Sequence, residues 1–169
     1  MGGALFLQLT LAEIGHYSKP RAGWETVIER FPSTVSEIEE ASKCFALGRY
    51  TACVFHLMRA LEPGLRALSD KLKIRKRSAN WHAFLSAMPA RIDRAFSRKS
   101  RASRAKHDYY SGLASQLGFI KTAWRNPTMH NPEKIYTEEM ARELIVLVRG
   151  YMREASKHLR ESQRNNAST

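Results

Sequence analysis

The sequence has little cysteine, and its two cysteines form no pattern typical of a disulfide framework or a metal centre. Cys44 and Cys53 belong to no CxxC pair and to no Cys/His spacing of the kind that zinc sites use. Their neighbours are apolar and follow a helical period, which favours reduced, buried thiols. We therefore expect neither a metal site nor a cofactor.

Long hydrophobic runs are missing as well. None approaches the ~20 residues that a membrane span needs. The apolar start from Met1 to Leu9 contains no basic residue, and the first lysine is Lys19, which argues against a signal peptide. A length of 169 residues, 43% of them hydrophobic and 26% charged, is typical of one globular domain. We expect a cytoplasmic protein without a membrane partner.

The formal net charge of +12 is concentrated in one part of the chain. Residues 66–106 contain thirteen Lys or Arg against Asp70 and Asp93, whereas the rest contains fifteen basic and fourteen acidic residues. RNA is the partner that this pattern favours, because Lys and Arg release the counterions condensed on phosphates. A solvated face without a partner is the alternative. The predicted nucleic-acid contacts are Lys73, Arg75, Lys76, Arg77, Arg98, Lys99, Arg101, Arg104 and Lys106.

Apolar residues recur at helical spacing from Pro32 onward. The spacing predicts helices over about 34–47, from Tyr50 to about Leu72, over about 81–97, along a seam from Tyr110 to Trp124, and from about Thr137 to Leu159. No strand and helix alternation supports an α/β sheet. The predicted fold is all-α, an up-and-down bundle of about five main helices. We expect residues 1–32 to form an arm that packs on the bundle, residues 33–162 to form the helical domain, and residues 163–169 to fray.

Local signals predict where these helices begin and end. Thr34 and Glu37 have the spacing of a capping box, and Gly48 can end a helix in the left-handed conformation. Pro63 should kink or break the second helix. Residues 97–106 lack any apolar side chain larger than alanine, which predicts an exposed loop. Pro127 disfavours helix for the residue before it, so the fourth helix should end near Arg125.

The segment from Arg125 to His130 is the best candidate for an active site. The predicted helix end places His130 in a short connection, between Asn126-Pro127 and Asn131-Pro132. Two prolines fix the backbone on either side of the imidazole, as a reacting group requires. An Arg followed by four to six residues and a His occurs six times in this chain, so its context, not its spacing, selects this site. A structural role, with both side chains capping the preceding helix, is the alternative.

Three segments of the chain carry a family resemblance. They are the Gly48-Arg49-Tyr50 connection, the run from Cys53 to Glu62, and Trp124-Arg125-Asn126 followed by Met129-His130. In this order, over about residues 34–160, they resemble a bacterial group of HEPN-domain proteins, which are all-α bundles. HEPN domains are marked by an Arg, four to six residues and a His, often with a polar residue after the Arg. Arg125, Asn126 and His130 match that pattern.

The resemblance implies RNA cleavage without a metal, as in toxin and defence members, by a homodimer that brings two motifs together. His130 would exchange protons with the ribose and the leaving oxygen, and Arg125 would stabilise charge on the phosphoryl oxygens. Asn126 would hydrogen-bond the phosphate, the ribose or His130 itself. A partner of the antitoxin or nucleotidyltransferase type is also implied. Other members bind a nucleotide or a protein without catalysis, and Pro127 departs from the polar or basic residue common at its position. A helical protein-interaction domain with an incidental basic face is the third reading.

Overall fold

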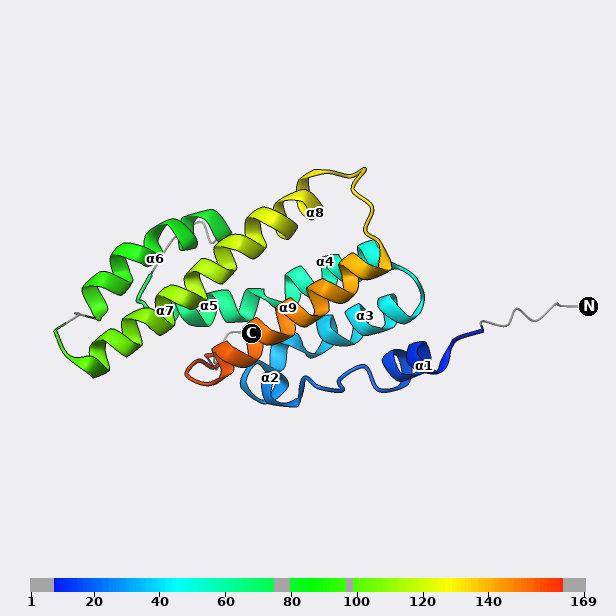
Figure 1. Ribbon diagram of the computed structural model, residues 1–169, viewed down its shortest axis with the longest axis horizontal. Coiled ribbons are helices and arrows are strands. Elements are labelled where there is room, and N and C mark those ends of the chain that lie inside the picture. The colour runs from blue at the N-terminus through cyan, green and yellow to red at the C-terminus, as the bar shows by residue number, and fades with distance from the viewer. Residues whose placement is uncertain (1–7, 75–79, 97–98, 163–169) are drawn as a thin grey trace, which may run out of the picture.

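The computed structural model describes residues 8–74, 80–96 and 99–162, and these residues form helices and turns without a strand. The all-α prediction is therefore confirmed. Figure 1 shows the helices in chain order. They are α1 (Leu11–Ser18), α2 (Glu25–Arg30), the short 3-10 helix η1 (Pro32–Thr34), α3 (Val35–Ala46), α4 (Tyr50–Ala60), α5 (Glu62–Lys71), α6 (Trp81–Ala95), α7 (Arg101–Ile120), the π-helical turn η2 (Lys121–Arg125), α8 (Asn126–His130) and α9 (Glu138–Ser156).

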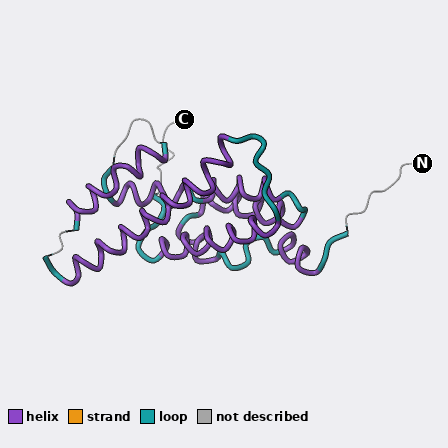
Figure 2. The backbone as a smooth tube through the Cα atoms, turned by 45° about the horizontal axis from the view of Figure 1, so that its top comes forward, coloured by secondary structure: helices purple, strands orange, loops and turns teal. Residues whose placement is uncertain are grey.

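The helices form a main bundle and a hairpin that extends from one end of it. In the main bundle α3 packs against α4, α4 against α9, α1 against α3, and α2 against α9. Helices α6 and α7 pack against each other and lie at the left end of Figure 1, where Figure 2 also shows them reaching beyond the other helices. The described part of the predicted N-terminal arm thus lies on the bundle, and the predicted frayed tail lies outside the described residues.

Several helix boundaries follow the sequence signals. Gly48 adopts a φ of 68° directly after α3, a conformation that glycine enters without steric cost. Pro63 occupies the first turn of α5, and the predicted second helix is interrupted at Leu61, between α4 and α5. Thr137 caps α9 by accepting a hydrogen bond from the backbone N–H of Met140 at 3.3 Å.

The predicted capping box at Thr34 is wrong. The hydroxyl of Thr34 donates to the carbonyl of Phe31 at 2.7 Å, because the chain enters α3 through η1 and Thr34 is already helical. The Glu37 carboxylate instead lies 2.8 Å from Nδ1 of His56 and accepts from Nε of Arg59 at 2.7 Å. Burial alone would raise the pKa of Glu37, but these two partners lower it below its ordinary value. Glu37 therefore links α3 to α4 rather than closing its own helix.

The core is formed by one stripe from each long helix. The predicted seam of α7 is buried from Tyr110 to Ile120, while Trp124 at its end is half-buried. The interior of α6 is continuous in spite of Pro89, which is exposed. The largest fully buried side chains are Tyr151, Phe31, Ile38, Leu57, Leu61, Leu68, Met88, Ile92, Leu113, Leu117, Ile120 and Leu144.

Gly64 of α5 lies close to Met152 and Tyr151 of α9, so a substitution at Gly64 tests this packing. A Cβ at Gly64 would lie 2.8 Å from Sδ of the buried Met152 and 3.4 Å from Cε1 of Tyr151. Gly64→Ala should therefore lower the free energy of unfolding by about 1–3 kcal/mol, measured by urea denaturation. Gly150→Ala is the matched control, since a Cβ there meets nothing within 4 Å, and it should stabilise the protein by about 0.5–1 kcal/mol. A stabilising Gly64→Ala would contradict the packing of α5 on α9.

Candidate active site and nucleic-acid interface

The helix that carries Arg125 does not end there, so the predicted boundary is wrong. Asn126 has helical backbone angles (φ −62°, ψ −48°), and its N–H donates to the carbonyl of Lys121, five residues back. Helix α8 then continues to His130, and the N–H of Asn131 closes its last turn on the carbonyl of Pro127 at 3.0 Å. From Arg101 to His130 the backbone is one continuous helical run.

A π-helical turn lets the helix pass through Pro127. Proline has no N–H to donate, and in a regular α-helix its ring would clash with the carbonyl four residues earlier, that of Ala123. The wider turn over Lys121–Arg125 shifts the hydrogen bonds by one residue just before the proline. This explains why the sequence rule that a residue before proline leaves the helix fails at Asn126.

The side chain of Arg125 is positioned by an aromatic residue far away in the sequence. Its guanidinium carbon lies 5.5 Å from the centre of the ring of Trp81, the first residue of α6. Trp81 is 4% exposed, and Arg125 is half-buried, so the cation lies against a fixed apolar surface. From the sequence we predicted only that a helix begins near residue 81, because nothing in the local pattern reveals that Trp81 meets Arg125.

The predicted rigid turn around His130 is also wrong, because His130 is the last residue of α8 and is exposed. At 3.6 residues per turn, two helical residues five apart point about 140° away from each other. Arg125 and His130 of one chain therefore occupy different faces of the helix. Asn126, directly after Arg125, is half-buried.

Tyr136 anchors the connection that follows His130. Its hydroxyl lies 2.7 Å from the hydroxyl of Thr128, which in turn donates to the carbonyl of Trp124 at 2.7 Å. The Tyr136 ring stacks on Trp124, with centroids 5.9 Å apart, and its backbone N–H donates to Oγ1 of Thr51 at 3.2 Å. These contacts join α8 to α4. The sequence analysis did not single out Thr128 or Tyr136, since a hydroxyl pair between separate segments has no sequence signature.

The described basic residues predicted to bind RNA lie at the tip of the α6–α7 hairpin, apart from Lys73 beyond the end of α5. The five described residues are all exposed, and Lys99 directly precedes Ser100, the N-cap of α7. These five are Lys73, Lys99, Arg101, Arg104 and Lys106. The other four predicted contacts, Arg75, Lys76, Arg77 and Arg98, lie outside the described residues.

The prediction of a loop over residues 97–106 is wrong from Arg101 onward. Ser100 caps α7 by accepting a hydrogen bond from the N–H of Ser103 at 3.1 Å, and the following Ala, Arg and Lys residues favour helix. Nε2 of the buried His107 lies 2.8 Å from Oδ1 of Asp93, which joins α7 to α6 near the tip. Low apolar content was mistaken for irregular structure, because a projecting helix can be solvated on most sides.

The structure does not bring the basic tip and Arg125 together. A helix rises 1.5 Å per residue, so Arg101 and Arg125 lie about 36 Å apart along their common helical run. Neither of the two main cavities, of about 610 and 360 Å³, is lined by Arg125, Asn126 or His130. The candidate site is thus an open surface, which suits an extended polymer better than an enclosed small molecule.

Other chemistries find little support in the described residues. Across 8–74, 80–96 and 99–162, no group of three or more His, Cys, Asp or Glu is placed to hold a metal ion. Burial raises the pKa of the Cys53 thiol to about 12, which makes it a poor nucleophile. None of the helices in those ranges has the length and apolar character needed to cross a membrane. Comparison of the chain with known protein families, curated proteins and solved structures finds no match.

The contact between Arg125 and Trp81 can be tested by changing the ring. Nε1 of Trp81 is buried and has no hydrogen-bond partner among the described residues, so Trp81→Phe should cost less than about 1.5 kcal/mol of folding free energy. Trp81→Ala removes the whole ring and should cost about 3–5 kcal/mol. Thermal and urea unfolding of both variants provide the measurement. Equal destabilisation by both would show that the indole N–H, not the ring surface, holds this region together.

Proposed function

We propose that this chain is a HEPN-like RNA-binding protein and a metal-independent endoribonuclease whose reacting groups are Arg125, Asn126 and His130. The observation that carries the proposal is the π-helical turn that ends at Arg125, with the guanidinium held against Trp81. Such turns are rare within α-helices and occur frequently at functional sites. A cytoplasmic location, with RNA as substrate, completes the proposal.

The chemistry requires only groups that this segment carries. An imidazole of His130 takes the proton from a ribose 2′-hydroxyl, whose oxygen attacks the adjacent phosphorus. The bond from phosphorus to the 5′-oxygen breaks, and a second imidazole donates a proton to that oxygen, leaving a 2′,3′-cyclic phosphate and a 5′-hydroxyl. Arg125 stabilises the charge on the phosphoryl oxygens through its guanidinium N–H groups, and the Asn126 amide donates to the phosphate or ribose.

A homodimer supplies the second imidazole and accounts for the helical geometry. Because Arg125 and His130 of one chain face different directions, two copies are needed to surround one phosphate. The outer face of α7 favours such pairing: residues 109–120 contain no charged residue, and Phe119 is 60% exposed. A Cβ at Gly112 or Gly118 would meet nothing within 4 Å, so no other element of the described chain covers this face.

The basic tip of the hairpin extends the contact along the RNA. Lys99, Arg101, Arg104 and Lys106 bind phosphates, and the three that lie in α7 are about 28–36 Å from Arg125 along the helix, which is several nucleotides from the cleaved bond. A cognate partner of the antitoxin or nucleotidyltransferase type would control the activity by covering either surface.

A non-catalytic module that binds a nucleotide or a protein partner is the second candidate. One observation favours it: the guanidinium of Arg125 already contacts Trp81, and His130 lies on another face of the helix. In that case the exposed helix end binds its partner without breaking a bond.

Cleavage assays separate the two candidates. The full-length protein, incubated with total RNA and with tRNA in the presence of a chelator, should produce fragments that end in a cyclic phosphate. Arg125→Ala and His130→Ala should each reduce the rate by about 100-fold or more. Arg153→Ala and His158→Ala are matched controls, because both residues are exposed and have the same spacing, with Arg153 in α9 and His158 two residues beyond its end, and they should keep the wild-type rate. Saturable nucleotide binding without cleavage by any form would favour the non-catalytic module.

The phosphate contacts of the hairpin predict a specific salt dependence. Log affinity for single-stranded RNA should fall with log salt concentration. Replacing Lys99, Arg101, Arg104 and Lys106 with Gln should make this slope shallower, by about 0.7 for each phosphate that the protein no longer binds. Affinity should be measured by fluorescence anisotropy at several salt concentrations. The control replaces Lys43 and Arg49, near the turn between α3 and α4. An unchanged slope after the hairpin substitutions would exclude these residues as phosphate contacts.

A further inference from the structure

The smaller cavity of the molecule lies beneath α1, away from the hairpin and from α8. Its volume of about 360 Å³ is near the lower end of the range for small-molecule sites. The cavity is lined by residues of α1, of the connection between α1 and α2, and of α3, α4 and α9. Most of that lining is apolar, namely Ala12, Gly15, Ala22, Trp24, Ile38, Ala41, Leu57 and Ile145.

The charged residues at this cavity all have the same sign. Lys19 and Arg149 line it, together with His16 and Ser42, and no carboxylate does. Throughout the described residues, neither Lys19 nor Arg149 takes part in a hydrogen bond or an ion pair through its side chain. By contrast, Glu37, Glu62, Asp70 and Glu161 line the larger cavity. The smaller cavity therefore complements an anion with an apolar body.

Arg149 is held in place, although no anionic partner among the described residues lies within hydrogen-bond distance of it. Its Nη1 lies 3.0 Å from the position that a Cβ on Gly23 would occupy, so the turn at Gly23 packs directly on the guanidinium. The nearby Glu25 carboxylate accepts from the N–H of Gly23 at 2.9 Å, and its pKa is lowered by backbone hydrogen bonds and further by the charges of Arg153 and Arg149. A guanidinium fixed in this way can bind a carboxylate through two parallel hydrogen bonds at little entropic cost.

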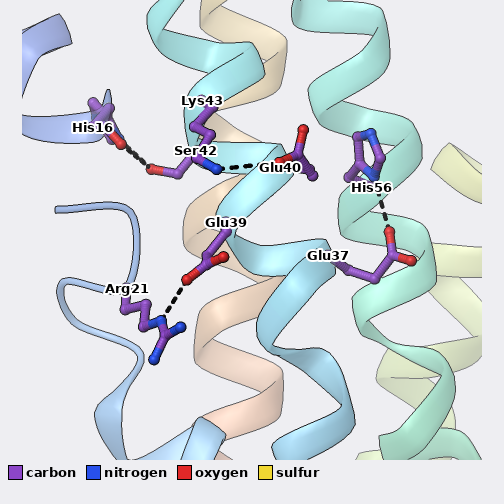
Figure 3. Close-up of polar contacts among 8 residues, drawn as sticks. All are labelled: His16, Arg21, Glu37, Glu39, Glu40, Ser42, Lys43 and His56. Atoms are coloured by element: carbon purple, nitrogen blue, oxygen red, sulfur yellow. Dashed lines mark hydrogen bonds and ion pairs between the residues drawn. The ribbon is translucent and has the colours of Figure 1, made fainter. Parts of the chain in front are cut away.

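The electrostatic potential at His16, inside the cavity, is positive. Burial lowers the pKa of the His16 imidazole, and the charges of Arg142 and Arg149 lower it further. Figure 3 shows His16 facing Ser42 of α3, where Nδ1 lies 3.3 Å from Oγ. The Ser42 hydroxyl donates to the carbonyl of His16 at 2.9 Å, so these two groups satisfy each other and leave the two cations to bind a ligand.

Helix α1 forms one side of the cavity. None of its residues is buried, although it packs against α3. Its polar link to α3 runs through His16 and Ser42, and in the connection that follows, Nε of Arg21 donates to Glu39 at 2.6 Å (Figure 3).

We propose that this cavity is a binding site for a small carboxylic acid with an apolar chain, whose carboxylate is bound by Arg149 and Lys19 and whose chain lies against Trp24, Ile38 and Ile145. The apolar lining, which offers few polar groups able to read a base edge, favours an aliphatic chain over a nucleotide. The site shares no lining residue with the proposed ribonuclease site, so either proposal can fail alone.

Calorimetric titration of the full-length protein with monomeric octanoate and with 1-octanol tests this site. Octanoate should bind with one-to-one stoichiometry and at least about tenfold more tightly than 1-octanol, because only the acid pairs with the cations. Arg149→Met should weaken octanoate binding by about tenfold and leave 1-octanol binding unchanged. Lys19 is the second cation of the lining. If Arg149→Met unfolds the protein, Lys19→Met replaces it, and it too should weaken the binding of octanoate but not that of 1-octanol.

Filling the cavity provides a steric test. Gly15 lines it, and a Cβ at Gly15 meets nothing within 4 Å, so Gly15→Leu should fold and block octanoate. Gly150→Leu is the matched control, because Gly150 on α9 is equally open and does not line the cavity, and it should bind octanoate as the wild type does. The proposal is overturned if octanoate does not bind, if 1-octanol binds as tightly, or if Gly15→Leu leaves binding intact.

Discussion

The loss of one backbone N–H at Pro127, inside a helix that nevertheless continues, is the constraint on which the candidate site depends. Without the π-helical turn the helix would have to end near Arg125, and His130 would lie in a separate loop. With it, one helical run carries the basic tip at its start, Arg125 near the contact with α6, and His130 at its end. Pro127 thus determines which face each group of the site occupies.

This geometry places the two groups of residues predicted from the sequence, the basic residues and the Arg125–His130 segment, at distant positions on the helical run. Arg101 and Arg125 lie about 36 Å apart, so the proposed phosphate binding by the tip and the proposed chemistry at the helix end would act on different parts of one RNA. Within a single chain Arg125 and His130 diverge, which makes pairing of two chains a requirement for the proposed cleavage. The uncharged outer face of α7, with Phe119 exposed, lies on the same helical run and favours that pairing.

Periodicity and strong local signals were sufficient to predict most of the bundle. The stripes of α7 and α9, the left-handed Gly48 and the start of α9 near Thr137 each depend on a few residues close in sequence, and the structure confirms them. The predictions that the structure contradicts failed for a different reason. A helix can widen around Pro127, and Ser100 can begin a helix that carries little apolar surface; these outcomes depend on hydrogen bonds and long-range contacts that a local rule does not include.

The candidate site was only partly accessible from sequence for the same reason. Arg125, Asn126 and His130 were identified from their order and their prolines, but their relative orientation follows from the helix. Trp81 and Tyr136, which fix Arg125 and the segment after His130, come from elements far apart in the chain. Contacts of this kind become visible only when the fold is known.

The central claim is that residues 121–130 form the end of an unbroken helix and that this end contacts RNA. Backbone NMR of the full-length protein, titrated with a 2′-O-methylated RNA that cannot be cleaved, tests both parts in one experiment. The account predicts helical ¹³Cα shifts through His130 and RNA-induced changes at Arg125, at His130 and over residues 99–106. Coil shifts from Asn126 onward, or RNA-induced changes that leave Arg125 and His130 unaffected, would contradict it.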